Sequence, residues 1–133
     1  MKYVLDTNII TAYLKGNERV KQRVQQVVLE GKEILINGIS YYEIKRGLLA
    51  KNAITQLKEF ELLGREFGLV LLDSQDIFDR ASEMYANLKQ EGELISDADI
   101  LIAALVITRN FTLVSADNDF NRIQELKLQN WLS

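Results

Sequence analysis

The sequence predicts an α/β fold of three layers, in which a central, mainly parallel sheet of four to five strands lies between two layers of helices. Two observations lead to this prediction. Short apolar runs alternate with longer segments in which apolar residues recur every three or four positions, as strands and helices do around a parallel sheet. The 133 residues, 47% hydrophobic and 26% charged, have the size and composition of one packed domain, so we expect a single domain over residues 1–133.

The first half of the chain begins with strand, helix, helix and strand. A short apolar run ends at Asp6, and the residues Asp6, Thr7 and Asn8 are of types that cap helices, so the chain passes there from a strand into a helix. Valines at helical spacing follow, and Gly31 separates them from a second apolar run. The pattern predicts strands over residues 2–5 and 33–37 and helices over 9–14 and 18–29.

A helical hairpin is expected next. Ser40 and Glu43 have the Ser-x-x-Glu spacing of a capping box, in which the serine accepts a hydrogen bond from the backbone three residues on and the glutamate returns one. Apolar residues then recur at three- and four-residue steps up to Gly68, a residue type that favours the end of a helix. The pattern predicts helices over residues 40–49 and 54–67.

The second half repeats the alternation of strand and helix. A third strand and a long helix ended by Gly92 come first. Ser96 and Asp99 then form a second cap-like start, before an apolar run whose cap and alanines favour a buried helix over a strand. The pattern predicts strands over residues 69–72, 111–115 and 127–131 and helices over 77–88 and 97–107.

Histidine and cysteine are both absent from the chain. Their absence excludes the usual zinc sites, thiolate nucleophiles, imidazole acid–base catalysis and Ser-His-Asp triads. A bound metal would need oxygen ligands, which suit Mg²⁺, Mn²⁺ or Ca²⁺. The residues to examine are therefore carboxylates that the fold can bring together.

Charge and hydropathy set weaker limits. Sixteen lysine and arginine side chains stand against nineteen acids, so a metal site that took four acids would leave one excess positive charge. The net charge of −3 thus does not exclude nucleic acid. No apolar run approaches the roughly 20 residues of a membrane span, and Asp6 comes too early for a signal peptide. We expect a cytoplasmic protein.

Four acids occupy comparable places in this scheme: Asp6 and Asp117 follow strands, and Glu43 and Asp99 stand in the first turns of helices. Functional groups of parallel sheets gather beyond the carboxyl ends of the strands. Carboxylates within a few ångströms repel one another, which a divalent cation relieves. Such a cation supports the hydrolysis of phosphodiesters.

Each acid also has a purely structural interpretation, which the residues leave open. Asp6 fits an ordinary helix N-cap. Glu43 and Asp99 fit the second half of a capping box. Asp117 and its neighbour Asp119 fit the acids of a polar loop.

Four segments taken together resemble the PIN-domain nucleases, in particular the VapC-type toxins. They follow one another in the family's order over nearly the whole chain, and the pairing of V-L-D-T-N near the start with D-x-L-I-A-A about ninety residues later is specific. The segments are Y-V-L-D-T-N-I (residues 3–9), Ser40-x-x-Glu43, D-I-L-I-A-A (residues 99–104) and L-V-S-A-D-N-D-F (residues 113–120).

The resemblance implies a PIN-like fold and a Mg²⁺-dependent endoribonuclease, with Mn²⁺ as a substitute ion. It implies that Asp6, Glu43 and Asp99 are catalytic metal ligands and that Asp117 is the fourth acid, a position for which Asp119 competes. It also implies an RNA substrate, a homodimer, cytoplasmic residence and, for a toxin of a type II toxin–antitoxin system, a small VapB-type antitoxin.

Further side chains have functional and structural interpretations of similar weight. Three polar residues beside the acids are either supporting hydrogen-bond donors or residues that cap helices and form turns. Asp97 is either a supporting acid of the site or an acid that stabilises the first turn of its helix. Two cations that follow Glu43 either contact RNA phosphates or are solvated. The three donors are Thr7, Asn8 and Ser115, and the cations are Lys45 and Arg46.

Apolar and aromatic residues leave similar alternatives. The apolar stripe of residues 54–67 fits core packing better than a dimer or antitoxin groove. Three aromatic side chains fit either base stacking or burial, and they are Tyr41, Tyr42 and Trp131.

Three other functions compete with a toxin ribonuclease. A PIN-fold module that binds RNA or protein without cleavage would not need Asp6, Glu43 and Asp99 intact. A housekeeping RNA-processing nuclease would keep the same acids. A receiver-type phosphoacceptor would need an acidic pair near its start and a lysine after its last strand, whereas Lys2 precedes Asp6 here.

Overall fold

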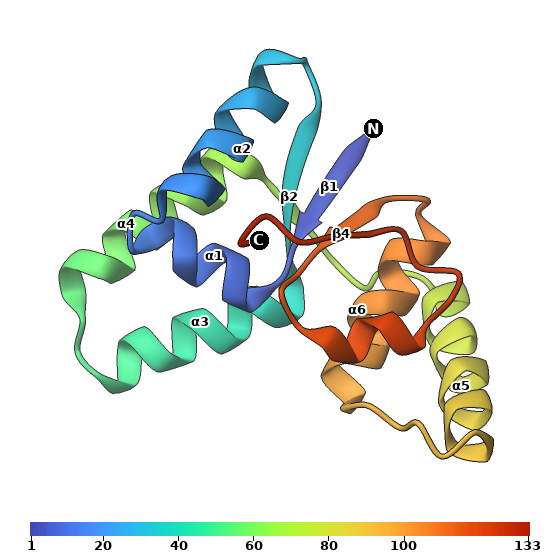
Figure 1. Cartoon of the computed structure of the whole chain (residues 1–133). Helices are drawn as coiled ribbons and strands as arrows, with labels where there is room; N and C mark the ends of the chain where they lie inside the picture. Colours follow the sequence, from blue (N-terminus) through green and yellow to red (C-terminus); the bar gives the residue numbers. More distant parts are fainter.

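In a computed structural model, which describes residues 1–133, the chain forms the predicted three layers (Figure 1). All five strands join one sheet in the order β3-β2-β1-β4-β5, and every neighbouring pair is parallel. The predicted sheet of four to five mainly parallel strands is confirmed, with five strands and no antiparallel pair. The strands are β1 (Lys2–Leu5), β2 (Glu33–Asn37), β3 (Leu69–Val70), β4 (Thr112–Val114) and β5 (Leu128–Gln129).

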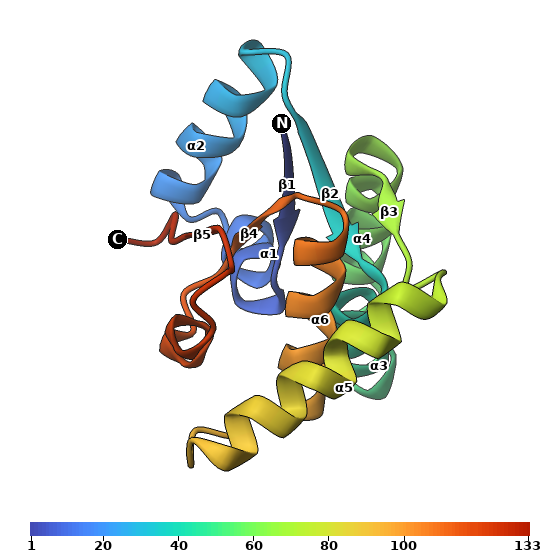
Figure 2. The same ribbon diagram turned by 90° about the vertical axis from the view of Figure 1, so that its right-hand side faces the viewer.

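Helices cover both faces of the sheet (Figures 1 and 2). Along β1 the side chains alternate between the two faces, so that Tyr3 and Leu5 join one core and Val4 joins the other. The first core includes α1 (Thr7–Leu14), α2 (Glu18–Leu29) and α4 (Ile54–Phe67), and the second includes α5 (Gln75–Gln90) and α6 (Asp97–Thr108). Helix α3 (Gly38–Ala50) forms the predicted hairpin with α4.

Three strands are shorter than the apolar runs predicted: β3, β4 and β5. The runs overestimate them because burial continues where hydrogen-bonded pairing stops. Leu72 and Phe111, for example, pack against the α5–α6 core without belonging to a strand. Apolar character therefore marks the core contact of these segments rather than their place in the sheet.

Local signals account for the ends of several helices. Gly68 ends α4 with a φ of +83°, a left-handed conformation that favours glycine, and the chain enters β3 at the next residue.

One element was not predicted, the short 3₁₀-helix η1 (Asn118–Arg122), which follows β4. None of the helices is both long and apolar enough to cross a membrane.

The order of the strands indicates where in the sheet a ligand site is expected. The chain builds outward from β1 to β2 and β3 on one side, and to β4 and β5 on the other. The crevice at the carboxyl ends of β1 and β4, where the direction reverses, is the usual ligand site of such sheets. Asp6 directly follows β1 and Ser115 directly follows β4, so both residues lie at this point.

Candidate metal site

Asp6 is the N-cap of α1 and also lies at the centre of a polar network. One carboxylate oxygen accepts a hydrogen bond from the Thr7 backbone N–H at 2.8 Å. The other accepts one from Ser115 Oγ at 2.7 Å, and Asn8 Nδ2 lies 3.4 Å from it. The side chain is only 5% exposed. Asp6 therefore does cap α1 with one carboxylate oxygen, and its second oxygen is oriented by the side chains of Ser115 and Asn8.

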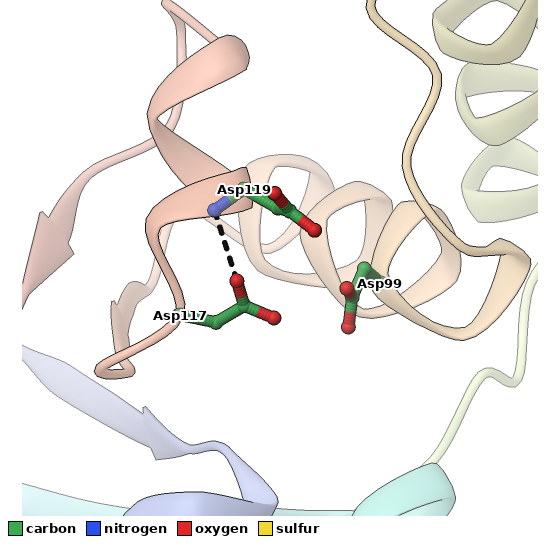
Figure 3. Close-up of side chains that lie close together, drawn as sticks. All are labelled: Asp99, Asp117 and Asp119. Atoms are coloured by element: carbon green, nitrogen blue, oxygen red, sulfur yellow. Dashed lines mark hydrogen bonds between the residues drawn. The ribbon is translucent and has the colours of Figure 1, made fainter.

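Three more carboxylates converge nearby (Figure 3). Asp99 stands in the first turn of α6, Asp117 is the N-cap of η1, and Asp119 lies within η1. One oxygen atom from each of the three lies within 4.8 Å of the others. The predicted cap of α6 is confirmed, since Ser96 Oγ accepts a hydrogen bond from the Asp99 backbone N–H at 3.2 Å.

Burial and repulsion from neighbouring acids make ionisation of Asp6 and Asp99 less favourable. Burial raises the pKa of Asp6 although Ser115 and Thr7 donate hydrogen bonds to it, and the charge of Asp117 raises this pKa further. Burial also raises the pKa of Asp99 to about 6, with added repulsion from Asp6, Asp117 and Asp119. Oxygen ligands under this repulsion suit a hard divalent cation.

This electrostatic arrangement predicts a pH dependence of stability. Asp99 has a pKa of about 6 in the folded protein against a reference value of 3.8, so the folded state holds the proton more tightly. Without metal, stability should fall as pH rises from about 4 to 6 and stay reduced above that range. Asp99→Asn should therefore raise the melting temperature at pH 7.5 and have little effect at pH 4. The expected gain is about 1 kcal/mol, because the side chain is partly exposed. An effect independent of pH would contradict this account.

The capping box predicted at Ser40 is wrong. Helix α3 begins at Gly38, and its N-cap is Asn37, whose Oδ1 accepts a hydrogen bond from the Ser40 backbone N–H at 2.8 Å. Ser40 is thus the third residue of the helix, and Glu43 lies in the second turn. The strand end supplies a cap three residues before the predicted one, which frees the Ser40 hydroxyl for side-chain contacts.

Glu43 joins the site indirectly. Like Asp6, it is not among the three acids whose oxygens lie within 4.8 Å of one another, which are Asp99, Asp117 and Asp119. Its Oε1 lies 3.4 Å from Thr7 Oγ1, which is itself 2.9 Å from Ser40 Oγ. Asn37 and Ser40 are fully buried beside the site, and the sequence analysis gave neither of them a role there. An asparagine at a strand end, three residues before a serine, was the available signal for Asn37 as a cap.

The three predicted donors do meet at the site. Ser115 Oγ donates to Asp6 and accepts from the Asp117 backbone N–H at 3.1 Å. Asn8 Oδ1 accepts from the Ala116 backbone N–H at 3.1 Å, which ties the first turn of α1 to the loop after β4. These bonds fix the loops that present the acids.

Asp97 lies apart from the clustered acids. Its side chain is exposed and lines an apolar groove between α5 and α6, with Phe78 and Tyr85 among its neighbours. Asp97 stands in the first turn of α6, where an acid stabilises the positive end of the helix dipole.

Lys45 and Arg46 point to different sides of α3. Lys45 Nζ lies over the ring of Tyr41 and 3.3 Å from its hydroxyl, and Tyr41 packs on Phe60 of α4. Arg46 is exposed and stacks over Tyr42. At 3.6 residues per turn, Arg46 stands about 60° around the helix from Glu43, and Lys45 about 160°. Arg46 is therefore closer than Lys45 to the side of α3 that carries Glu43.

The structure also distinguishes between burial and exposure for the aromatic and apolar residues. Trp131 is 3% exposed and stacks on Tyr3 in the core, whereas Tyr42 is 59% exposed. Helix α4 buries Phe60, Leu63 and Phe67, as core packing of its stripe predicts.

Comparison with known proteins places this geometry in a family. The PIN domain model matches residues 3–126. Ribonuclease VapC1 of Methanocaldococcus jannaschii is 32% identical, covering 96% of this chain and 85% of the relative. The structure of VapBC2 from Rickettsia felis, bound to a DNA fragment from its promoter, aligns with a TM-score of 0.90 at 26% identity over 98% of this chain and 99% of that one.

A second solved structure agrees over the full length. VapBC-1 from nontypeable Haemophilus influenzae aligns with a TM-score of 0.88 at 27% identity and covers 100% of both chains. Both structures share the α/β arrangement described above. The family match over most of the sequence and the VapC relative at 32% identity lead to one conclusion: the chain belongs to the PIN domain family, among its VapC-type members.

Proposed function

We propose that this protein is a metal-dependent endoribonuclease, the VapC-type toxin of a type II toxin–antitoxin system. The proposal rests on one observation. Buried or half-buried carboxylates converge near the carboxyl ends of β1 and β4, in a chain that has no histidine or cysteine. The relatives named as VapC ribonucleases support RNA as the substrate. Intact acids favour cleavage over binding alone.

The donor set fits a hard divalent ion, and we assign Mg²⁺ with Mn²⁺ as a substitute. Asp6, Asp99 and Asp117 would hold it, with Glu43 at the edge of the site. Asp117 is favoured over Asp119, whose carboxylate lies 3.8 Å from the Arg122 guanidinium and is therefore partly neutralised. When bound, the ion would acidify a water molecule and offset charge on the scissile phosphate.

Polar groups around Asp6 orient its carboxylate. Thr7 N–H and Ser115 Oγ fix the carboxylate by bonds of 2.8 and 2.7 Å, and Asn8 ties the neighbouring loop in place. A carboxylate held in this way keeps the geometry that the reaction needs without reorganising.

The partners follow from the same assignment. The solved relatives are VapBC complexes, so we propose a small VapB-type antitoxin that binds this protein and blocks RNA cleavage. We further propose a homodimer in the cytoplasm.

Expression of the protein alone should arrest growth, and co-expression of the adjacent small gene should relieve the arrest. A lack of arrest would favour a housekeeping nuclease.

A nuclease assay tests the catalytic proposal directly. Purified protein should cleave single-stranded RNA with Mg²⁺ or Mn²⁺, lose activity in EDTA and regain it when the ion is restored. Asp6→Asn protein, purified in parallel, controls for contaminating ribonuclease. Equal cleavage by the variant would attribute the activity to a contaminant, and RNA binding without cleavage would favour a binding module.

Arg46→Ala should weaken RNA binding, because Arg46 is an exposed cation about 60° around α3 from Glu43. Loss of one phosphate contact should reduce the slope of log affinity against log salt concentration by about one. Lys45→Ala is the matched control, since its ammonium group is engaged with Tyr41. Filter-binding titrations at several salt concentrations measure both slopes, and equal changes would refute the proposed path of the RNA.

A further inference from the structure

Asn37, the last residue of β2, is fully buried and has a partner for every polar group of its side chain. Its Oδ1 accepts from the Ser40 backbone N–H at 2.8 Å. Its Nδ2 donates to the Leu5 carbonyl at 3.1 Å and to Ser40 Oγ at 2.9 Å. Leu5 directly precedes Asp6, so this one amide links the end of β1, the end of β2 and the start of α3.

The surroundings leave this amide a single orientation. The Leu5 carbonyl can only accept a hydrogen bond, and the Ser40 backbone N–H can only donate one. The amide nitrogen must therefore face Leu5 and the amide oxygen must face the Ser40 backbone. The second hydrogen on Nδ2 then points at Ser40 Oγ, which receives it.

The Ser40 hydroxyl is the next member of this network. Its oxygen has two lone pairs, one of which accepts from Asn37 Nδ2. The other can accept from Thr7 Oγ1, which lies 2.9 Å away. Thr7 Oγ1 also lies 3.4 Å from Glu43 Oε1, and the Thr7 backbone N–H donates to Asp6. Ser40 is therefore held between Asn37 and a residue that contacts two of the acids.

We propose that Asn37 is a positioning residue of the acidic site, which holds the Ser40 hydroxyl in place against Thr7 and thereby restricts the two acids that Thr7 contacts, Asp6 and Glu43. The inference rests on the proposed metal-dependent function. Without the amide donor, the Ser40 hydroxyl would be free to turn, and the orientations of Asp6 and Glu43 would be less restricted. Loss of such a supporting contact typically lowers metal affinity or activity by about 10- to 100-fold.

Asn37→Ser separates this role from helix capping. Serine is as good an N-cap as asparagine, but it lacks the amide donors. The matched control is Asn17→Ser, because Asn17 caps α2 in the same way, with Oδ1 accepting from the Val20 backbone N–H at 3.1 Å. Calorimetric titration with Mn²⁺ should show affinity reduced about 10-fold or more for Asn37→Ser and unchanged for Asn17→Ser. Equal Mn²⁺ affinity of Asn37→Ser and wild type would overturn the inference.

A double-mutant cycle tests whether Asn37 acts through Ser40. Ser40→Ala keeps the cap and the Leu5 bond of Asn37 and should weaken Mn²⁺ binding to a similar degree. The double variant should bind Mn²⁺ no more weakly than Ser40→Ala alone, and additive losses would overturn the inference. If Asn37→Ser fails to fold, unchanged Mn²⁺ affinity in Ser40→Ala overturns it equally.

The same titrations distinguish this inference from the proposed function. Wild-type protein that binds Mn²⁺ and cleaves RNA, with Asn37→Ser equal in both, would refute only the role of Asn37. Wild-type protein that neither binds Mn²⁺ nor cleaves RNA would refute the proposed function and the inference together.

Discussion

Asp99→Asn is expected to reduce the rate of RNA cleavage by about a thousand-fold, which corresponds to about 4 kcal/mol of transition-state stabilisation. An asparagine keeps the shape of the side chain and the start of α6, because the Ser96 cap bonds the backbone of residue 99. It removes the negative charge at the point where three carboxylate oxygens meet. The loss should therefore come from the site and not from the fold. Single-turnover cleavage of a labelled single-stranded RNA measures it.

Asp97→Asn is the control, since Asp97 lies in the same turn of the same helix but is exposed beside the α5–α6 groove. Its cleavage rate should stay within about two-fold of wild type, because a surface change alters stability by only about 0.5 kcal/mol. Asp99→Asn should also melt no lower than wild type at pH 7.5. Similar losses in both variants would mean that negative charge along α6, rather than a ligand position, determines activity.

The fold was largely predictable because its signals are local and repeated. Burial of the sheet on both faces makes the central strands nearly continuously apolar, as in residues 3–5. The helices are indicated by the spacing of their apolar residues and by glycines at their ends, such as Gly68. The limits of the edge strands were not predictable in the same way. Pairing in β3 and β5 depends on a neighbour that is distant in sequence, whereas burial of residues such as Leu72 does not require pairing.

Of the four acids predicted for the candidate site, the structure brings carboxylate oxygens of Asp99 and Asp117 within 4.8 Å of each other, together with one of Asp119. The hydrogen-bond network around the acids was not predictable. Asp6 and Asp99 stand out because they follow a strand and a serine cap. Ser40 was misinterpreted because the Ser-x-x-Glu pattern is satisfied on paper, while Asn37 caps the helix in three dimensions. Nothing local in the sequence shows that the Ser40 hydroxyl will meet Thr7, 33 positions away.

Asp117 and Asp119 are two residues apart in a polar run, and the family resemblance favours Asp117 as the fourth acid with Asp119 as its competitor. The 3₁₀-helix distinguishes their surroundings, since Asp117 caps it and Asp119 lies beside Arg122. The proposed preference for Asp117 is therefore supported by an element that the sequence did not predict.

Mn²⁺ at about 100 times its dissociation constant is expected to raise the melting temperature by about 10 °C. Binding to the folded state alone contributes about 2.7 kcal/mol under these conditions. For a domain of this size, 1 kcal/mol corresponds to about 4 °C. The ion also offsets the cost of ionising Asp6 and Asp99, whose pKa values are raised by burial and, to a smaller extent, by repulsion, so stabilisation and occupancy of the site should rise together.

The pH dependence of this shift identifies the site. Protons compete with the ion for Asp99, whose pKa is about 6, so at a fixed Mn²⁺ concentration the shift should be much smaller at pH 5 than at pH 7.5. Asp99→Asn should show little shift at either pH, and Asp97→Asn should behave as wild type. Thermal melts of the three proteins with Mn²⁺ and with EDTA measure the difference. A shift of full size in Asp99→Asn would mean that Asp99 is not a ligand of the ion.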